Sequence, residues 1–261
     1  MNRLQTKLKQ LKTEEKKALV AYLVAGDPDI DSTLELMHLF VSSGVDIIEI
    51  GVPFTDPIAE GPIIQKAHDR SLKHNISLQN IIDLVKDFRQ VDTSTPIVLM
   101  GYLNTFIAHI NLINQSDAIG VDAVLVVDIP GELELSNYGI TNPNIDTISL
   151  ISPTTSDERI KQITKNSSGF IYYVNLRGVT GSSNLDIEEI TSNLNKIRTH
   201  TNVPTLAGFG IKSYEDAKVL AKYADGVIVG SSIVEMIDAV KDTKDFSKIK
   251  EYLEGLSRAI N

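Results

Sequence analysis

Eight short runs rich in valine and isoleucine alternate along this sequence with segments whose apolar residues recur at helical spacing. The runs cover residues 18–23, 46–50, 96–100, 123–127, 146–151, 169–174, 203–207 and 226–229. Most are continuously apolar, which is typical of parallel strands buried on both faces. Eight strand–helix units within 261 residues predict an α/β fold, a (β/α)8 TIM barrel. An open, doubly wound sheet is the alternative.

The segments between the runs are expected to be helices. Residues 33–43 place Leu34, Met37 and Val41 on one face, and Gly44 follows where a left-handed residue commonly ends a helix. Further helices are predicted over residues 78–88, 104–114, 157–165, 187–198, 214–222, 233–240 and 245–259, with a short one over 133–138. An extra N-terminal helix is expected over residues 3–16. Since no composition break divides the chain, residues 1–261 are interpreted as a single barrel catalytic domain.

Composition excludes several classes of function. Lys and Arg number 25 and Asp and Glu 34, so the net charge is −9, which disfavours nucleic acid and anionic membranes as partners. The absence of cysteine excludes disulfides, thiolate nucleophiles and Cys-based metal sites. The longest apolar stretch, residues 18–26, is too short to span a membrane, and residues 1–17 do not resemble a signal peptide. We therefore expect a cytoplasmic protein.

Glu49 is the first candidate for chemistry, because barrel active sites lie at the carboxyl ends of the strands. It stands one residue before the end of the second run, between Ile48 and Ile50. Facing outward, its charge would be buried among apolar helices at a large cost. Facing the barrel mouth, its desolvation would raise the pKa and suit general acid–base catalysis. A structural carboxylate paired with a lysine or the backbone is the alternative.

The loop after this run, residues 51–62, contains three prolines and two glycines, which indicate a shaped loop. It carries two more carboxylates, Asp56 and Glu60. A solvated charge is the ordinary interpretation of an acidic loop residue. Proximity to Glu49 at the barrel mouth makes Glu60 a second catalytic candidate.

The sixth run ends in a Gly- and Ser-rich loop over residues 175–183, which is typical of a lid with hinges at Gly178 and Gly181. Tyr172 and Tyr173 precede it. Because successive strand residues point to opposite faces, only one of these tyrosines can line the barrel.

Two glycine turns indicate a phosphate site. One spans residues 208–210 after the seventh run, and the other spans residues 230–232 before a helix. Backbone N–H groups at glycine turns and at a helix N-terminus bind anions, and barrels often hold phosphate after strands 7 and 8. Tight turns without a ligand are the alternative.

Histidine and metal chemistry are not predicted. The five histidines are expected in helices or in segments remote from the strand ends: His38, His68, His74, His109 and His200. No acidic cluster has the spacing of a metal site. The residues alone therefore predict a phosphate-binding barrel without a cofactor, in which lyase and isomerase chemistry are equally possible.

Residues 49–57, continued by residues 61–65, resemble the most specific motif of the tryptophan synthase alpha chain family. Residues 26–28, 178–181, 208–211 and 230–231 match the family in order and near the expected spacing, so the resemblance covers essentially the whole chain. It implies a lyase of L-tryptophan biosynthesis that cleaves indole-3-glycerol phosphate to indole and glyceraldehyde 3-phosphate by a retro-aldol reaction.

The resemblance also assigns roles to residues. Glu49 corresponds to the main acid–base carboxylate, Glu60 to the carboxylate that stabilises charge at the indole nitrogen, and Tyr172 to the active-site tyrosine. Thr180 corresponds to the lid threonine. Gly181, Gly210, Gly230 and Ser231 match the phosphate cradle, and the residues expected around the indole are Tyr22, Met100, Val127, Ile151 and Phe209.

A partner is implied as well. The family's alpha chain binds a beta chain in an α2β2 heterotetramer, and the beta chain carries pyridoxal phosphate and receives indole through a tunnel. Asp56 and Pro57 lie in the loop that communicates with this partner. The cofactor is therefore expected on the beta chain, with no cofactor or metal in this chain.

Two departures leave alternatives open. The family has aspartate where this chain has Glu60, and a displacement of about 1 Å can cost roughly 100-fold in rate. Residues 175–177 also differ from the family's common lid sequence, with Arg177 as a candidate replacement charge. A largely non-catalytic subunit that activates the beta chain, another phosphate-binding barrel enzyme, and a lyase that needs no partner therefore remain possible.

Overall fold

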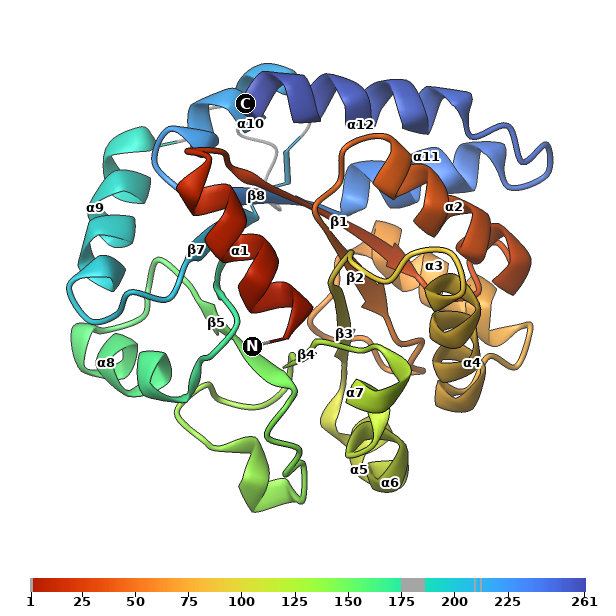
Figure 1. Ribbon diagram of the computed structural model, residues 1–261, viewed down its shortest axis with the longest axis horizontal. Helices are drawn as coiled ribbons and strands as arrows, with labels where there is room; N and C mark the ends of the chain where they lie inside the picture. Colours follow the sequence, from red (N-terminus) through yellow and green to blue (C-terminus); the bar gives the residue numbers. More distant parts are fainter. Residues whose placement is uncertain (1, 175–185, 209, 212) are drawn as a thin grey trace.

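The computed structural model of the chain describes residues 2–174, 186–208, 210–211 and 213–261. Across these residues, eight parallel strands form one closed barrel in which each strand pairs with the next and β8 pairs with β1 (Figure 1). The strands are β1 (Ala18–Val24), β2 (Ile47–Gly51), β3 (Ile97–Gly101), β4 (Ala123–Val126), β5 (Asp146–Ile151), β6 (Ile171–Val174), β7 (Thr205–Gly208) and β8 (Gly226–Val229). The predicted TIM barrel is confirmed.

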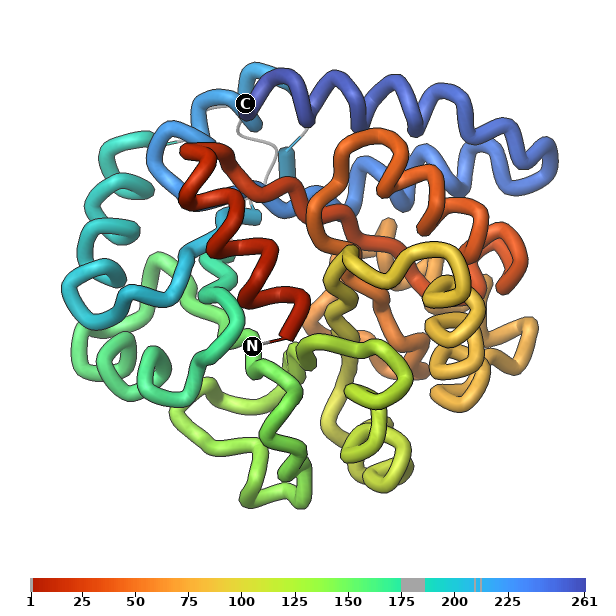
Figure 2. Tube along the Cα trace, viewed as in Figure 1, coloured from red at the N-terminus to blue at the C-terminus, as the bar shows by residue number. Residues whose placement is uncertain are grey.

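Helices surround the barrel. They are α1 (Arg3–Thr13), α2 (Ile30–Ser42), α3 (Pro62–Leu72), α4 (Leu78–Arg89), α5 (Leu103–Ala108), α6 (Ile110–Ile113), α7 (Ser116–Ile119), α8 (Asp157–Asn166), α9 (Ile187–Arg198), α10 (Tyr214–Ala221), α11 (Ser231–Val240) and α12 (Ser247–Ile260). In Figure 2 the C-terminus lies near the segment that joins α1 to β1, where the Lys17 N–H donates to the side-chain oxygen of Asn261 at 2.7 Å. None of the described helices is long and apolar enough to cross a membrane.

The helix predictions were wrong in several places, and the short helix α7 was among the helices missed. The sequence analysis missed α3, although Pro62 at its first position is a common helix start because proline lacks only an N–H that would be unpaired there. The predicted helix over residues 104–114 is broken at His109, whose φ of −125° and ψ of 36° separate α5 from α6. The short helix between β4 and β5 is a 3-10 turn, Leu135–Tyr138.

Alternation along the strands creates two apolar layers. Residues such as Val20, Ile47 and Val98 form the cluster inside the barrel, whereas Leu19 and Ile48 belong to the cluster that packs against the helices. Both faces of each strand are therefore buried, which explains the continuous apolar runs in the sequence.

Helix α1 closes the amino-terminal end of the barrel. Leu4, Leu8 and Leu11 are buried in the same cluster as the interior strand residues, and α1 lies across the barrel opening in Figure 1. Its start is anchored by Arg3, whose Nη1 lies 2.9 Å from Oδ1 of buried Asp122. Helix α1 therefore covers this end of the barrel, and the strand ends that carry the predicted site residues lie at the opposite end.

Candidate active site

Glu49 is a buried carboxyl group near the carboxyl end of β2. The register places it beside Tyr22 of β1 and Val98 of β3, and alternation puts it on the same face as interior Ile47. Its exposed fraction is 1%, and its Oε1 has no hydrogen-bond partner among the described residues. Burial, and secondarily the negative charge of Glu60, raise the pKa of Glu49 to about 8. Glu49 therefore holds its proton in much of the neutral range.

Glu60 approaches the same space from the loop between β2 and α3. The side chain is partly buried, and burial raises the pKa of Glu60 to about 7. Its charge influences Glu49, Tyr22 and Tyr172, so these groups surround one volume at the carboxyl end of the barrel. Two carboxyl groups with different raised pKa values suit paired acid and base roles.

Two tyrosines line this volume, and glycines make room for them. Tyr172 belongs to the interior cluster, whereas Tyr173 packs in the outer one. A Cβ at Gly51 would lie 2.2 Å from the hydroxyl oxygen of Tyr22, and one at Gly208 would lie 2.4 Å from the Tyr172 ring. Burial raises the pKa of both phenols well above the ordinary value, and the two carboxylates raise it further. Both tyrosines therefore remain protonated as potential donors.

Tyr102, directly after β3, is a site residue that the sequence analysis missed. Its hydroxyl oxygen accepts a hydrogen bond of 3.0 Å from the Ala59 N–H, next to Glu60. Its buried ring stacks on Phe54 with a centroid distance of 4.7 Å. No local pattern identifies this role, because the contact joins two loops that follow different strands.

His68 also contacts this loop, although the histidines were expected only in helices or in segments remote from the strand ends. It lies on the missed helix α3, and its Nδ1 is 3.0 Å from the Phe54 N–H, which donates to it. The side chain is buried, and its desolvation lowers the pKa of His68 to about 4. The imidazole is therefore neutral and serves as an acceptor.

The structure brings together most of the residues expected around an indole, but not all of them. Met100 and Val127 pack against the interior cluster, as does Leu150. Ile151 does not join them, because it is 1% exposed in the outer cluster and is paired with Tyr173. The alternation along β5 thus puts Leu150 at the position expected for Ile151. Phe209 lies outside the described residues.

The loops after β7 and β8 lie together and offer backbone donors. The Ser232 hydroxyl donates a hydrogen bond of 2.7 Å to the Ile211 carbonyl oxygen, which joins the two loops. Gly230 precedes α11 without a capping side chain, and Ser231 is the first helical residue. Gly210 has a φ of +61°, which favours glycine, and open space lies beside its α-carbon. An anion fits such an arrangement. The other cradle and lid candidates, Thr180 and Gly181, lie outside the described residues.

Asp56 and Pro57 lie at the outer part of the β2–α3 loop. Asp56 is exposed and Pro57 is partly exposed. Both are therefore placed at the rim rather than among the buried carboxyl groups. In the described part of the chain, no three His, Cys, Asp or Glu side chains are grouped so as to hold a metal ion.

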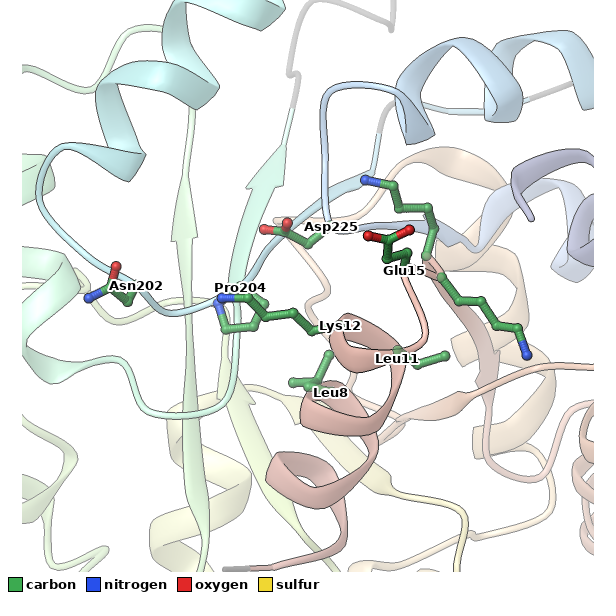
Figure 3. A pocket seen from close by; sticks show the side chains of 9 residues that line it. Leu8, Leu11, Lys12, Glu15, Asn202, Pro204 and Asp225 are labelled. Atoms are coloured by element: carbon green, nitrogen blue, oxygen red, sulfur yellow. The ribbon is translucent and has the colours of Figure 1, made fainter.

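A cavity of ≈ 350 Å³ lies at the other end of the barrel, beside α1 (Figure 3). Leu8, Leu11 and Pro204 supply its apolar wall, and Lys12 and Asp225 are among its charged residues. Because these residues precede β1, β7 and β8, the cavity is remote from the strand ends that carry Glu49 and Tyr172.

Comparison with known proteins identifies a family with this arrangement. The sequence model described as tryptophan synthase alpha chain matches residues 8–261. The tryptophan synthase alpha chain of Nitrosomonas europaea is 43% identical over 265 residues, covering 100% of this chain and 96% of the relative. That of Marinobacter nauticus is 45% identical over 241 residues, covering 91% and 89%.

Solved structures agree in fold. Tryptophan synthase subunit alpha from Legionella pneumophila str. Paris has a TM-score of 0.91 and 37% identity, covering 100% of this chain and 98% of that chain. A chain of the aminoacrylate-bound tryptophan synthase from M. tuberculosis has a TM-score of 0.86 and 25% identity, with 100% of both chains covered.

Proposed function

The chain belongs to the tryptophan synthase alpha chain family, and from this premise we propose which of its residues cleave indole-3-glycerol phosphate. It is a carbon–carbon lyase of tryptophan biosynthesis that releases indole and glyceraldehyde 3-phosphate. One observation carries the proposed mechanism: Glu49 and Glu60 place two carboxyl groups with raised pKa values at the open end of the barrel. We also propose that residues 1–261 act as one barrel domain.

The first step activates the indole ring. Protonated Glu49 donates its proton to the ring carbon that carries the glycerol side chain. Ionised Glu60 accepts the proton of the ring nitrogen, so that no net charge accumulates on the ring. The pKa values of about 8 and about 7 favour these opposite protonation states near neutral pH.

The second step breaks the carbon–carbon bond. Glu49, now a carboxylate, removes the proton from the hydroxyl group beside that bond, and the hydroxyl carbon becomes the aldehyde of glyceraldehyde 3-phosphate. The bonding electrons return to the ring while Glu60 gives the proton back to the ring nitrogen. Indole leaves, and both carboxyl groups regain their starting states, so the protons balance over one turnover.

The remaining site residues bind and orient the substrate. Tyr22, Met100, Val127 and Leu150 provide an apolar surround for indole, with Phe209 as a further candidate. Tyr172 keeps its proton and contacts the substrate beside Glu49. Gly210, Gly230 and Ser231 hold the phosphate through backbone N–H groups, and Thr180 and Gly181 contribute from the lid. The separation of these two binding regions defines the substrate's orientation across the mouth.

The dependence of kcat/KM on pH tests the two carboxyl roles. Activity is expected to rise as Glu60 ionises at about pH 7 and to fall as Glu49 loses its proton at about pH 8, which gives a narrow maximum between them. Indole release from indole-3-glycerol phosphate is measured between pH 5.5 and 10, with and without a beta chain. A flat profile from pH 6 to 9, or an optimum below pH 6, would contradict the assignment.

In this family the alpha chain works with a beta chain, and pyridoxal phosphate belongs to the beta chain. The cleavage proposed above needs only side chains of the alpha chain. We propose an α2β2 heterotetramer in which Asp56 and Pro57 contact the beta chain. Three exposed apolar residues support this rim as the interface: Ile58 is 82% exposed, and Ile107 and Leu133 are each 42% exposed. They follow β2, β3 and β4, which are neighbours in the barrel. A location in the cytoplasm stays a prediction from the sequence.

Replacing Ile58 by serine is expected to weaken binding of the beta chain at least tenfold, because an apolar contact is lost at the proposed interface. Calorimetric titration with the beta chain measures the affinity. Val91→Ser is the matched control, since Val91 is 77% exposed but lies before β3, at the opposite end of the barrel. Equal affinity of the Ile58→Ser variant and the control would remove Ile58 from the interface.

A further inference from the structure

His68 is a buried histidine whose hydrogen-bonding state can be deduced. Its exposed fraction is 2%, and Nδ1 accepts the Phe54 N–H at 3.0 Å. A neutral imidazole carries one proton, and an accepting Nδ1 places that proton on Nε2. The Nε2 atom has no hydrogen-bond partner among the described residues. One ring nitrogen is thus committed to the backbone of the β2–α3 loop.

The helix that presents this acceptor is firmly held. Arg70, two residues further on, donates to both carboxylate oxygens of Asp27, with N–O distances of 2.7 and 2.8 Å. Ile64 and Ala67 of the same helix pack in an apolar cluster with Tyr22. Because α3 is fixed on both sides of His68, the imidazole provides a rigid point for the loop.

The loop that carries Glu60 is held at two of its backbone N–H groups. His68 binds the N–H of Phe54, and Tyr102 binds the N–H of Ala59. Gln65 adds a bond of 2.8 Å from its Nε2 to the carbonyl oxygen of Glu60. The segment between the two N–H contacts is short, so a movement at Phe54 would displace the segment that leads to Glu60.

We propose that His68 is a positioning residue, whose Nδ1 fixes the β2–α3 loop through Phe54 and thereby sets the place of the Glu60 carboxylate. This inference rests on the role proposed above for Glu60. If the loop shifts, the Glu60 carboxylate shifts with it, and a misplacement of about 1 Å can lower a rate roughly 100-fold. The ring need not touch the substrate to have this effect.

Three substitutions at position 68 distinguish the effect of the hydrogen-bond acceptor Nδ1 from the effect of the volume of the ring. In His68→Asn the side-chain oxygen can replace Nδ1, in His68→Gln it replaces Nε2 instead, and His68→Leu removes both. We expect the Leu and Gln variants to lose hydrogen-exchange protection of the Phe54 amide and at least tenfold in kcat, with KM changed less than threefold. The Asn variant should retain protection and at least a third of kcat. His74→Leu, at an exposed position after the same helix, is the control.

The outcomes are distinguishable. Retained Phe54 protection and kcat in His68→Leu would overturn the proposal, as would equal losses in all three variants, because packing alone would then explain them. Lost protection with unchanged kcat would show that the loop contact does not serve catalysis. Glu60→Gln is measured alongside: full activity of that variant would contradict the role of Glu60, whereas the Phe54 amide would still report on the His68 contact.

Discussion

Replacing Glu49 by glutamine is expected to lower kcat for indole release by roughly 1,000-fold or more, because general acid–base catalysis contributes about 100- to 10,000-fold. Glutamine preserves the size of the side chain but neither donates a proton to the ring carbon nor removes one from the hydroxyl group. Steady-state indole release, with and without the beta chain, measures the effect. A variant that keeps more than a tenth of the wild-type kcat would exclude Glu49 as the acid–base group.

The same variant has a second readout that controls for misfolding. The folded-state pKa of Glu49, about 8, lies above its ordinary value of 4.5. The folded state therefore binds more protons, and the wild-type protein should lose stability as the pH rises from about 4.5 through 8. Glu49→Gln loses this contribution but keeps the one from Glu60, whose pKa burial raises to about 7. Its stability should therefore fall less over this range, and it should be the more stable protein at pH 9. Unfolding by urea at pH 5 and pH 9 measures this, and identical pH dependence would contradict burial of the carboxyl group.

Removing the charge of Glu60 is expected to cause the second large decrease in kcat. Glu60→Gln is expected to lower kcat about 100-fold, since the amide cannot accept the proton of the ring nitrogen, while binding of the phosphate should leave KM nearly unchanged. The rising limb of the pH profile near pH 7 should disappear with the carboxyl group. Persistence of that limb in Glu60→Gln would assign it to another residue.

Glu60→Asp tests whether the longer side chain is fitted to this barrel. The Ala59 N–H is held by Tyr102, so the backbone is not free to compensate for a lost methylene group. We expect kcat to decrease by up to roughly 100-fold, because the carboxylate would be withdrawn by about 1 Å. An increase over the wild type would instead favour a chain that mainly activates the beta chain and has lost much of its own catalysis.

Much of the fold could be predicted because each strand of a parallel barrel is buried on both faces. The run over residues 18–23, for example, became β1 (Ala18–Val24), and β5 has the predicted bounds. Helix α3 escaped prediction because the prolines around it dominate the local pattern. The break at His109 could not be predicted either, because apolar residues keep their helical spacing across it while the helical backbone conformation is interrupted there.

Site residues could be predicted from the sequence where their position on a strand determines that the side chain faces the barrel interior. Glu49 is the carboxylate within an apolar run, and the alternation of Tyr172 and Tyr173 required that only one face inward, although not which one. Tyr102 and His68 could not be found in this way, because their roles arise from contacts with the backbone of another segment. For Ile151, the resemblance gave a position in the sequence, but the strand register determines that Leu150 occupies the interior.

The plug formed by α1 has a consequence for how this protein is made. Leu4, Leu8 and Leu11 pack with Leu206 and Ile228, so α1 packs against residues that are synthesised much later than itself. The barrel likewise closes where β1 pairs with β8. During synthesis, the apolar side of α1 and the β1 edge that pairs with β8 must therefore wait until the β7 and β8 segments have been made. The nascent chain thus has its longest exposure to misassociation at α1 and β1, where a chaperone that shields this helix and strand would be most effective.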